Sequence, residues 1–366
     1  MEDIMRKLLL VILPILLLVG CSGSKEIKIG LAITQTYDQV SSDYGIAIRN
    51  GYLMAIDEIN ASGGIDGREI VPVIRDDQND IEKAKEIVDE FASENINIVV
   101  GFSTSKMYPA IQYAQENYDM LFVAATMSSS ELTGIDDNLI RITSSDEIQI
   151  VGHAEIANET LDLDSMGIIY DADNEKYTKP FISIFSELYK GDILFKDFSK
   201  EPDTIISLIH EHNPDGLLYI VPSHTFIKIQ QQLSKNDLVL PTLISGWAAT
   251  PGLFDFGGDV INDVYCIRIF DDTSVDEKYQ RFLDDFAFKY NSQVSRPSYI
   301  TYETMMVIFE ALKDQDDISP ENLKSRILEI STFDGLQGTF TINEYGDTFR
   351  TIHKMQIQNR KFVPID

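Results

Sequence analysis

Short runs of apolar residues alternate with amphipathic segments of helical period along most of this chain. Nine runs have the length and β-branched character of strands, at residues 27–33, 70–76, 96–101, 120–125, 166–171, 192–198, 216–221, 241–246 and 264–270. Several are apolar almost throughout, which is typical of parallel strands covered on both faces by helices. The alternation therefore predicts a doubly wound α/β fold.

The segment between the first two runs illustrates the helical half of the pattern. Its apolar face is formed by Ile48, Tyr52, Ala55, Ile56 and Ile59. Residues 62–64 (SGG) follow, and glycine commonly stops a helix. We therefore expect an amphipathic helix that ends at this turn.

The length and the later pattern suggest two lobes. Nine parallel strands divide better into two sheets than into one, and 366 residues are many for a single domain. Polar stretches at 141–150 and 270–276 interrupt the alternation, and three helical segments and two strands follow, at 277–290, 298–313, 320–330, 338–342 and 352–358. A chain that leaves one lobe, builds a second and returns would hold its ligand site between the lobes.

The N-terminus has the features of a cleaved targeting segment. An apolar run at 8–20 follows Arg6 and Lys7, and it is shorter than the roughly 20 residues of a membrane-spanning helix. It ends at residues 18–21 (LVGC), which resemble the lipobox of bacterial lipoproteins. We expect residues 1–20 to be a signal peptide, Cys21 to be lipidated and 21–26 to form a tether. A plain secretory signal is the alternative, and translation starts at Met1 or Met5.

Charge and cysteine content narrow the class further. Asp and Glu number 59 against 30 Lys and Arg, and the net charge of −29 argues against nucleic acid as a partner. Besides Cys21 the only cysteine is Cys266, so the mature chain has no intrachain disulfide. Cys266 lies in the apolar run 264–270 and is expected to be a buried, inert thiol.

One short motif could suggest catalysis. Ser103 and Lys106 match the S-x-x-K pattern of serine acyl-enzymes, but no K-[ST]-G element follows. The hydroxyl-rich turn after run 96–101 has a simpler use, because hydroxyls and backbone N–H groups at a helix N-terminus bind an anion. No nucleotide-binding glycine motif is present.

The candidate metal ligands lack convergent spacing. His210 and His212 would point about 200° apart on a helix, so they cannot share one ion, and the stretch is expected to be an exposed helix end. The acidic residues 76–80 (DDQND) lack the spacing of a calcium loop and are expected to form a strand-end turn with helix-capping acids. We predict no metal site and no cofactor.

Several motifs in order resemble those of the leucine/isoleucine/valine-binding proteins, the branched-chain amino-acid class of ABC-transporter receptors. Residues 57–68 (DEINASGGIDGR) are similar to the family's helix-turn signature. The others are 76–77 (DD), 101–105 (GFSTS), 130–133 (SELT), 174–177 (NEKY), 245–248 (SGWA), 302–303 (YE) and 335–338 (GLQG). Together they extend the resemblance from about residue 27 to 360.

The resemblance implies a type I periplasmic-binding fold. Two doubly wound, Rossmann-like lobes with parallel sheets would be joined by three hinge crossings, near residues 142, 271 and 343. The N-terminal lobe would comprise 27–142 and 272–342, and the C-terminal lobe 143–271 and 343–366. Such a protein closes around a small solute without catalysis.

The resemblance also places the ligand site. A ligand carboxylate would contact hydroxyls at two strand ends, and tyrosines would line the cleft from both lobes. These residues are Thr104, Ser105, Thr126, Ser128, Tyr44 and Tyr177, with Tyr299 as a further aromatic candidate. Hydroxyls and amides can neutralise a carboxylate without a buried cation.

One position departs from the amino-acid-binding members. Where they carry an acid for the ligand's α-ammonium, this chain has Trp247, its only tryptophan. An indole supplies no negative charge, although its face accepts a cation. An apolar or aromatic carboxylate, or a cationic ligand, is therefore as compatible as an α-amino acid. Glu303 or Asp171 could supply the charge, but a capping or hinge contact is the favoured role of Glu303.

The expected function is a lipid-anchored, extracytoplasmic and monomeric receptor that delivers a small amino acid, carboxylate or amide to an ABC permease. A ligand sensor that signals to a membrane partner is the alternative. A serine hydrolase that uses Ser103 and Lys106 is disfavoured, because no base and orienting acid accompany them.

Overall fold

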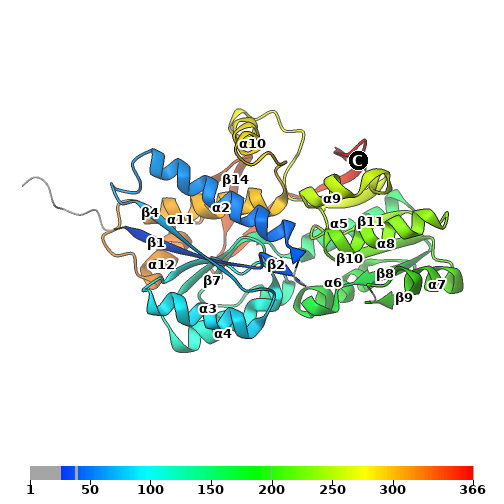
Figure 1. Ribbon diagram of the computed structural model, residues 1–366, viewed down its shortest axis with the longest axis horizontal. Coiled ribbons are helices and arrows are strands. Elements are labelled where there is room, and N and C mark those ends of the chain that lie inside the picture. Colours follow the sequence, from blue (N-terminus) through cyan, green and yellow to red (C-terminus); the bar gives the residue numbers. More distant parts are fainter. Residues whose placement is uncertain (1–25, 38–39, 199, 366) are drawn as a thin grey trace, which may run out of the picture.

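All nine apolar runs form strands in the computed structural model, which describes residues 26–37, 40–198 and 200–365. The strands and helices divide into two lobes, which lie side by side in Figure 1. The predicted signal peptide and Cys21 lie outside the described residues. Within the described ranges, no helix combines the length and apolar character that crossing a membrane requires.

The first lobe contains an eight-stranded sheet in the order β13-β14-β15-β7-β6-β5-β1-β4. Its strands are β1 (Ile27–Ile33), β4 (Ile70–Asp76), β5 (Ile98–Gly101), β6 (Leu121–Ala124), β7 (Leu139–Ser144), β13 (Thr332–Gly335), β14 (Gly338–Ile342) and β15 (Asp347–Phe349). The strands from β15 to β4 run parallel, whereas β13 and β14 add an antiparallel edge.

The second lobe contains a seven-stranded sheet in the order β17-β16-β12-β11-β10-β8-β9. Its strands are β8 (Ser165–Tyr170), β9 (Asp192–Asp197), β10 (Gly216–Ile220), β11 (Thr242–Ile244), β12 (Val264–Arg268), β16 (His353–Gln358) and β17 (Lys361–Pro364). Only β16 and β17 run antiparallel to their neighbours. Parallel sheets were expected. The central strands of both sheets are parallel, but each sheet also has an antiparallel edge that was not expected.

Helices cover both faces of each sheet, as the apolar strands predicted. One face of the first sheet is covered by α2 (Asp43–Ala61), α10 (Glu277–Tyr290), α11 (Arg296–Leu312) and α12 (Pro320–Ile330). The other face is covered by α3 (Ile81–Ser93) and α4 (Tyr108–Asn117). On the second sheet, one face packs α5 (Asp146–Glu155) and α6 (Glu175–Leu188), and the other packs α7 (Pro202–His212), α8 (Ser223–Lys235) and α9 (Pro251–Phe256).

Short elements complete the chain. They are the hairpin strands β2 (Thr36–Tyr37) and β3 (Val40–Ser41), the 3₁₀ turns η1 (Ser105–Met107), η2 (Ser130–Leu132), η4 (Ala172–Asn174) and η5 (Gly258–Ile261), and the π-helical turn η3 (Ile156–Thr160). Cys266 is fully buried on β12, and burial raises the pKa of its thiol to about 12, as expected for an inert cysteine.

The chain crosses between the sheets three times, after β7, β12 and β15. Two crossings lie close to the expected places, but the third lies after Phe349 and not near 343, because β15 pairs with β7 and β14 in the first sheet. Asp347 on β15 anchors it there through a buried 2.5 Å ion pair with Arg141 on β7.

A second buried ion pair stands at the third crossing. Glu303 on α11 lies 2.6 Å from the guanidinium of Arg350, and both side chains are almost completely buried. The other carboxylate oxygen of Glu303 accepts a 2.7 Å hydrogen bond from the backbone N–H of Leu336. Glu303 therefore makes the hinge contact favoured from the sequence.

Candidate ligand-binding site

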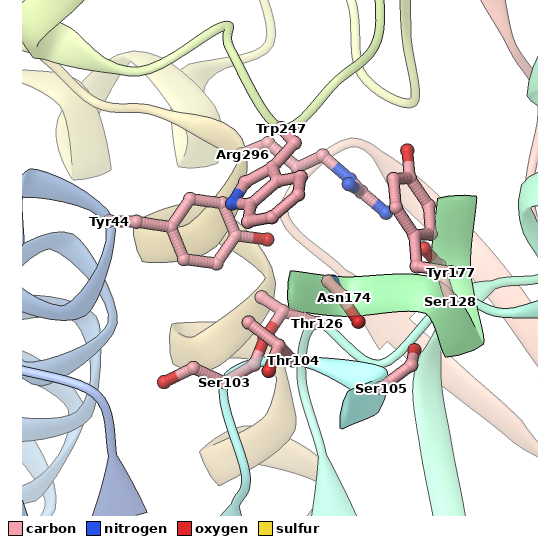
Figure 2. Close-up of a pocket in the computed structure, with 10 residues that line it drawn as sticks. All are labelled: Tyr44, Ser103, Thr104, Ser105, Thr126, Ser128, Asn174, Tyr177, Trp247 and Arg296. Carbon is pink, nitrogen blue, oxygen red and sulfur yellow. The ribbon is translucent and has the colours of Figure 1, made fainter. Parts of the chain in front are cut away.

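A narrow pocket lies between the two lobes, at the ends of their strands. Every ligand residue predicted from the sequence lines it except Tyr299, as the close-up in Figure 2 shows. The first lobe supplies Tyr44, Ser103, Thr104, Ser105, Thr126, Ser128 and Arg296, and the second supplies Asn174, Tyr177 and Trp247. The free space inside it is about 20 Å³, room for about one water molecule, so the side chains of the two lobes nearly meet here.

Five hydroxyl-bearing residues form one side of the pocket, and we call them the hydroxyl floor: Ser103, Thr104, Ser105, Thr126 and Ser128. Three of them follow β5 and two follow β6. These strands are parallel neighbours, so their carboxyl ends meet at one edge of the sheet. The topology thus brings together groups that lie about twenty residues apart in the sequence.

Three members of the hydroxyl floor can present hydroxyl protons to a ligand, whereas the hydroxyl of Thr126 donates to the carbonyl of Ser103 at 2.8 Å. The Oγ of Ser103 accepts a 2.9 Å hydrogen bond from the backbone N–H of Thr34, so its own proton remains to be donated. The Oγ of Ser105 accepts from the N–H of Ser129 at 3.3 Å in the same way. The hydroxyl of Thr104 is buried and has no hydrogen-bond partner among the described residues. Such donors suit a carboxylate.

Tyr44 enters the pocket from the start of α2. Its neighbour Gly45 allows α2 to approach the end of β1, because a Cβ at Gly45 would lie 1.9 Å from the carbonyl oxygen of Thr34. Burial raises the pKa of Tyr44, although the charge of Arg296 and a hydrogen bond with Thr126 oppose this. The phenol therefore stays neutral and faces the hydroxyl floor from the same lobe.

Tyr177 and Trp247 form the wall contributed by the second lobe. Tyr177 lies in the first turn of α6, and Trp247 follows β11. Their rings meet edge to face, with centroids 5.9 Å apart and planes at 90°. Burial raises the pKa of Tyr177, so its hydroxyl is also neutral. The two rings give the pocket an apolar side opposite the floor.

Tyr299 does not line this pocket. It is 2% exposed and stacks on Phe270 with a centroid distance of 4.5 Å, and its ring also meets Tyr279 and Phe282 edge to face. It belongs to the core between α10, α11 and the first sheet. The prediction of a ligand contact is corrected here, because α11 turns this side chain toward the aromatic core of its own lobe.

The sequence missed Arg296 and Asn174. Arg296 begins α11 and is 4% exposed, and its Nη2 donates a 2.7 Å hydrogen bond to the hydroxyl of Thr143. Asn174 ends η4, and its buried Oδ1 accepts no hydrogen bond from a described residue. The helix predicted at 298–313 begins at Arg296 in the structure, and its sequence pattern does not show that this side chain reaches the cleft.

Asp146 lies near the pocket, in the first turn of α5 where the chain enters the second lobe. Burial raises the pKa of its carboxyl to about 7, although Ser130 and the charges of Arg141 and Arg296 lower it. Asp171, one source considered for the missing negative charge, follows β8 and also has its pKa raised by burial. Neither carboxyl is among the residues that line the pocket.

Contacts across the cleft hold the lobes together in this structure. The hydroxyl of Ser129 donates a 2.5 Å hydrogen bond to the carbonyl of Lys176 in the second lobe. The ammonium of Lys176 lies 2.7 Å from the carboxylate of Glu131 in the first. These contacts lie beside the pocket, so they close the same cleft that it occupies.

The S-x-x-K motif is not arranged as a catalytic pair. Lys106 donates a 2.7 Å hydrogen bond to the carbonyl of Asn79, and the Oγ of Ser103 accepts from Thr34. The acidic turn after β4 behaves as expected, since Asp80 caps α3 at the N–H of Lys83. His210 and His212 lie exposed in the last turn of α7, also as expected.

Residues 26–361 match the family described as periplasmic binding protein. This chain belongs to that family. Its members bind solutes outside the cytoplasm, and the fold is that of solute-binding proteins and not of an enzyme family. The resemblance drawn from the sequence to the branched-chain amino-acid class of the family is confirmed.

A curated relative is the Leu/Ile/Val-binding protein homolog 1 of Brucella abortus, 33% identical over 116 residues. That alignment covers 31% of this chain and 31% of the relative, so the chain matches less than a third of the relative's length.

Solved structures share the whole fold. LivJ of Streptococcus pneumoniae, a branched-chain amino acid transporter substrate binding protein in complex with isoleucine, superposes with a TM-score of 0.84 at 22% identity. The superposition covers 92% of this chain and 98% of LivJ. A solute binding protein of an ABC transporter from Rhodopseudomonas palustris, in complex with 3,4-dihydroxybenzoic acid, has a TM-score of 0.80 at 15% identity over 93% and 96% of the chains. The predicted type I periplasmic-binding fold is confirmed.

Proposed function

We propose that this protein is an extracytoplasmic receptor that captures one small carboxylate, amino acid or related amide between its lobes and delivers it to an ABC permease. The observation that carries the proposal is the pairing of the hydroxyl floor in one lobe with Tyr177 and Trp247 in the other. A ligand that touches both sides stabilises the closed arrangement, which a permease can distinguish from the open one.

The family and its solved structures support this reading. One structural neighbour holds isoleucine and another holds 3,4-dihydroxybenzoic acid, and both ligands carry a carboxylate. The floor in this chain offers the hydroxyl donors that a carboxylate needs.

The proposed location follows from the N-terminus. Lipidation of Cys21 would attach the receptor to the outer side of a membrane and leave residues 21–26 as a tether. We propose that it acts there as a monomer.

A thermal-shift screen of amino acids, amides and aromatic or aliphatic acids tests the proposal. The melting temperature should rise with the concentration of at least one small carboxylate, because the ligand binds only the folded state. If no compound raises it, the receptor function is contradicted. Deletion of the gene should then abolish uptake of the ligand found, whereas normal uptake would favour the sensor function.

A further inference from the structure

Arg296 is a buried cation that forms no ion pair with a described carboxylate, although the buried carboxyl of Asp146 feels its charge from farther away. Its guanidinium is held by the neutral hydroxyl of Thr143, and its Nε has no hydrogen-bond partner among the described residues. In the same ranges, no carboxylate forms an ion pair with it within 4 Å. A charge taken out of water is costly unless an opposite charge pairs with it, and this one faces the ligand pocket.

The lining of this pocket favours an anion over an ammonium group, and the nearest acids that face the cleft line the larger cavity next to it. None of the described residues that line the ligand pocket is an Asp or a Glu, and Arg296 is its one charged member. An α-amino acid would bring its own positive charge toward this guanidinium, and like charges in a poorly solvated site repel each other. Asp146 is not among the residues that line the pocket, but the charge of Arg296 lowers the pKa of its carboxyl.

Arg296 and three members of the hydroxyl floor, Ser103, Thr104 and Ser105, lie on opposite sides of the pocket. Figure 2 shows the guanidinium at the top, beside Trp247 and Tyr177, and Ser103, Thr104 and Ser105 at the bottom. A ligand between them meets donors at both ends and aromatic rings along its length. The ligand that complements this pocket is therefore a short chain with an acidic group at each end.

We propose that the ligand is a small dicarboxylate without an α-ammonium group, bound with one carboxylate on the hydroxyl floor and the other on Arg296. A guanidinium pairs with a carboxylate through two parallel N–H donors, which fixes the orientation of the ligand as well as its charge. This inference rests on the proposed receptor function and assigns Arg296 as the residue that determines specificity.

Calorimetric titration with matched probes tests the proposal that the ligand is a dicarboxylate bound by Arg296. Glutarate should bind at least tenfold more tightly than valerate, which has the same carbon count and one carboxylate, and more tightly than leucine or glutamate. R296Q should weaken glutarate binding at least tenfold and change valerate binding less than threefold, and R296K should lie between. The control R75Q alters a half-buried arginine outside the pocket lining that pairs with Glu90 and Glu94, and it should leave the affinities for all four probes unchanged.

The outcomes separate this inference from the receptor function. If leucine or valerate binds more tightly than glutarate, the dicarboxylate assignment is overturned while the receptor function stands. An unchanged preference for glutarate in R296Q overturns the role of Arg296. If no probe binds and the broader screen also finds nothing, both are overturned. Should R296Q fail to fold, the order of affinities in the unaltered protein decides the ligand class.

Discussion

The carboxylate of Asp43 accepts a 3.0 Å hydrogen bond from the hydroxyl of Ser223 across the cleft between the lobes. The same oxygen accepts a second hydrogen bond from the hydroxyl of Thr250. Asp43 begins α2 in the first lobe, whereas Ser223 begins α8 and Thr250 precedes α9 in the second. One charged group therefore joins both lobes next to Tyr44 and the ligand pocket.

Replacement of Asp43 with alanine should speed ligand release. The variant loses two hydrogen bonds to a charged acceptor that form only when the lobes are closed, and each such bond contributes about 1.5–3 kcal/mol net of the water that replaces it. We expect dissociation to be at least tenfold faster, measured by stopped-flow mixing, since about 1.4 kcal/mol corresponds to a factor of ten. D57N is the matched control, because Asp57 lies on the same helix and pairs with Lys289 inside the first lobe. An unchanged dissociation rate in D43A would exclude a role in closure.

Trp247 should report ligand binding by itself. It is the only tryptophan in the chain, it lines the pocket, and it is half-buried without ligand. Ligand and lobe closure remove water from the indole, so its emission should move to shorter wavelength on titration. W247F should abolish the signal and serves as the control. A ligand that binds by calorimetry without any change in emission would place binding elsewhere.

Thr104→Ala should weaken carboxylate binding by about 1–3 kcal/mol, the cost of a lost hydrogen bond to a charged group. The hydroxyl of Thr104 has no partner among the described residues, so its loss affects the ligand more than the fold. Calorimetry measures the affinity and thermal unfolding checks the fold. An affinity equal to that of the unaltered protein would remove Thr104 from the site.

Glu303→Gln should destabilise the protein by about 3–5 kcal/mol, because it leaves the buried guanidinium of Arg350 without its counter-charge. The amide keeps the shape of the side chain and can still accept from Leu336. Urea unfolding measures the change. E329Q, which removes an exposed partner of Arg326, should cost less than about 1 kcal/mol. Equal effects of the two variants would show that burial does not strengthen the pair at the hinge.

Asp146 should make the folded state less stable as the pH rises. Its pKa is raised from 3.8 to about 7 in the folded protein, so between these values the folded state binds more protons than the unfolded state. The free energy of unfolding therefore falls from about pH 4 to about pH 7 and then levels. D146N removes this contribution and should show a smaller decline over that window in urea unfolding. Parallel pH profiles for the two proteins would contradict the raised pKa.

The apolar runs predicted most of the fold because a strand buried on both faces has little room for polar side chains. The run at 27–33 matches β1 and the run at 70–76 matches β4 residue for residue. The stretch at 141–150, predicted as a linker, contains the end of β7 and the start of α5. Arg141 and Thr143 gave it a polar character, and their partners Asp347 and Arg296 lie more than 150 residues away in the sequence.

The site was predictable as far as it depends on strand ends. The family resemblance placed Thr104 and Thr126 in one site, and the physical reason is that hydroxyls that follow two neighbouring parallel strands converge. Arg296 and Tyr299 show the limit of this reasoning. Both lie in the first turn of α11, but one faces the pocket and the other stacks on Phe270. The orientation of that helix is set by packing that its own sequence does not reveal.

The most direct test of the central claim is a crystal structure of the protein with the small carboxylate that raises its melting temperature most. We predict one ligand molecule between the lobes, with a carboxylate within hydrogen-bond distance of the Thr104 hydroxyl and with Tyr177 and Trp247 of the second lobe against it. A ligand bound to one lobe alone, or outside the cleft, would contradict capture by closure.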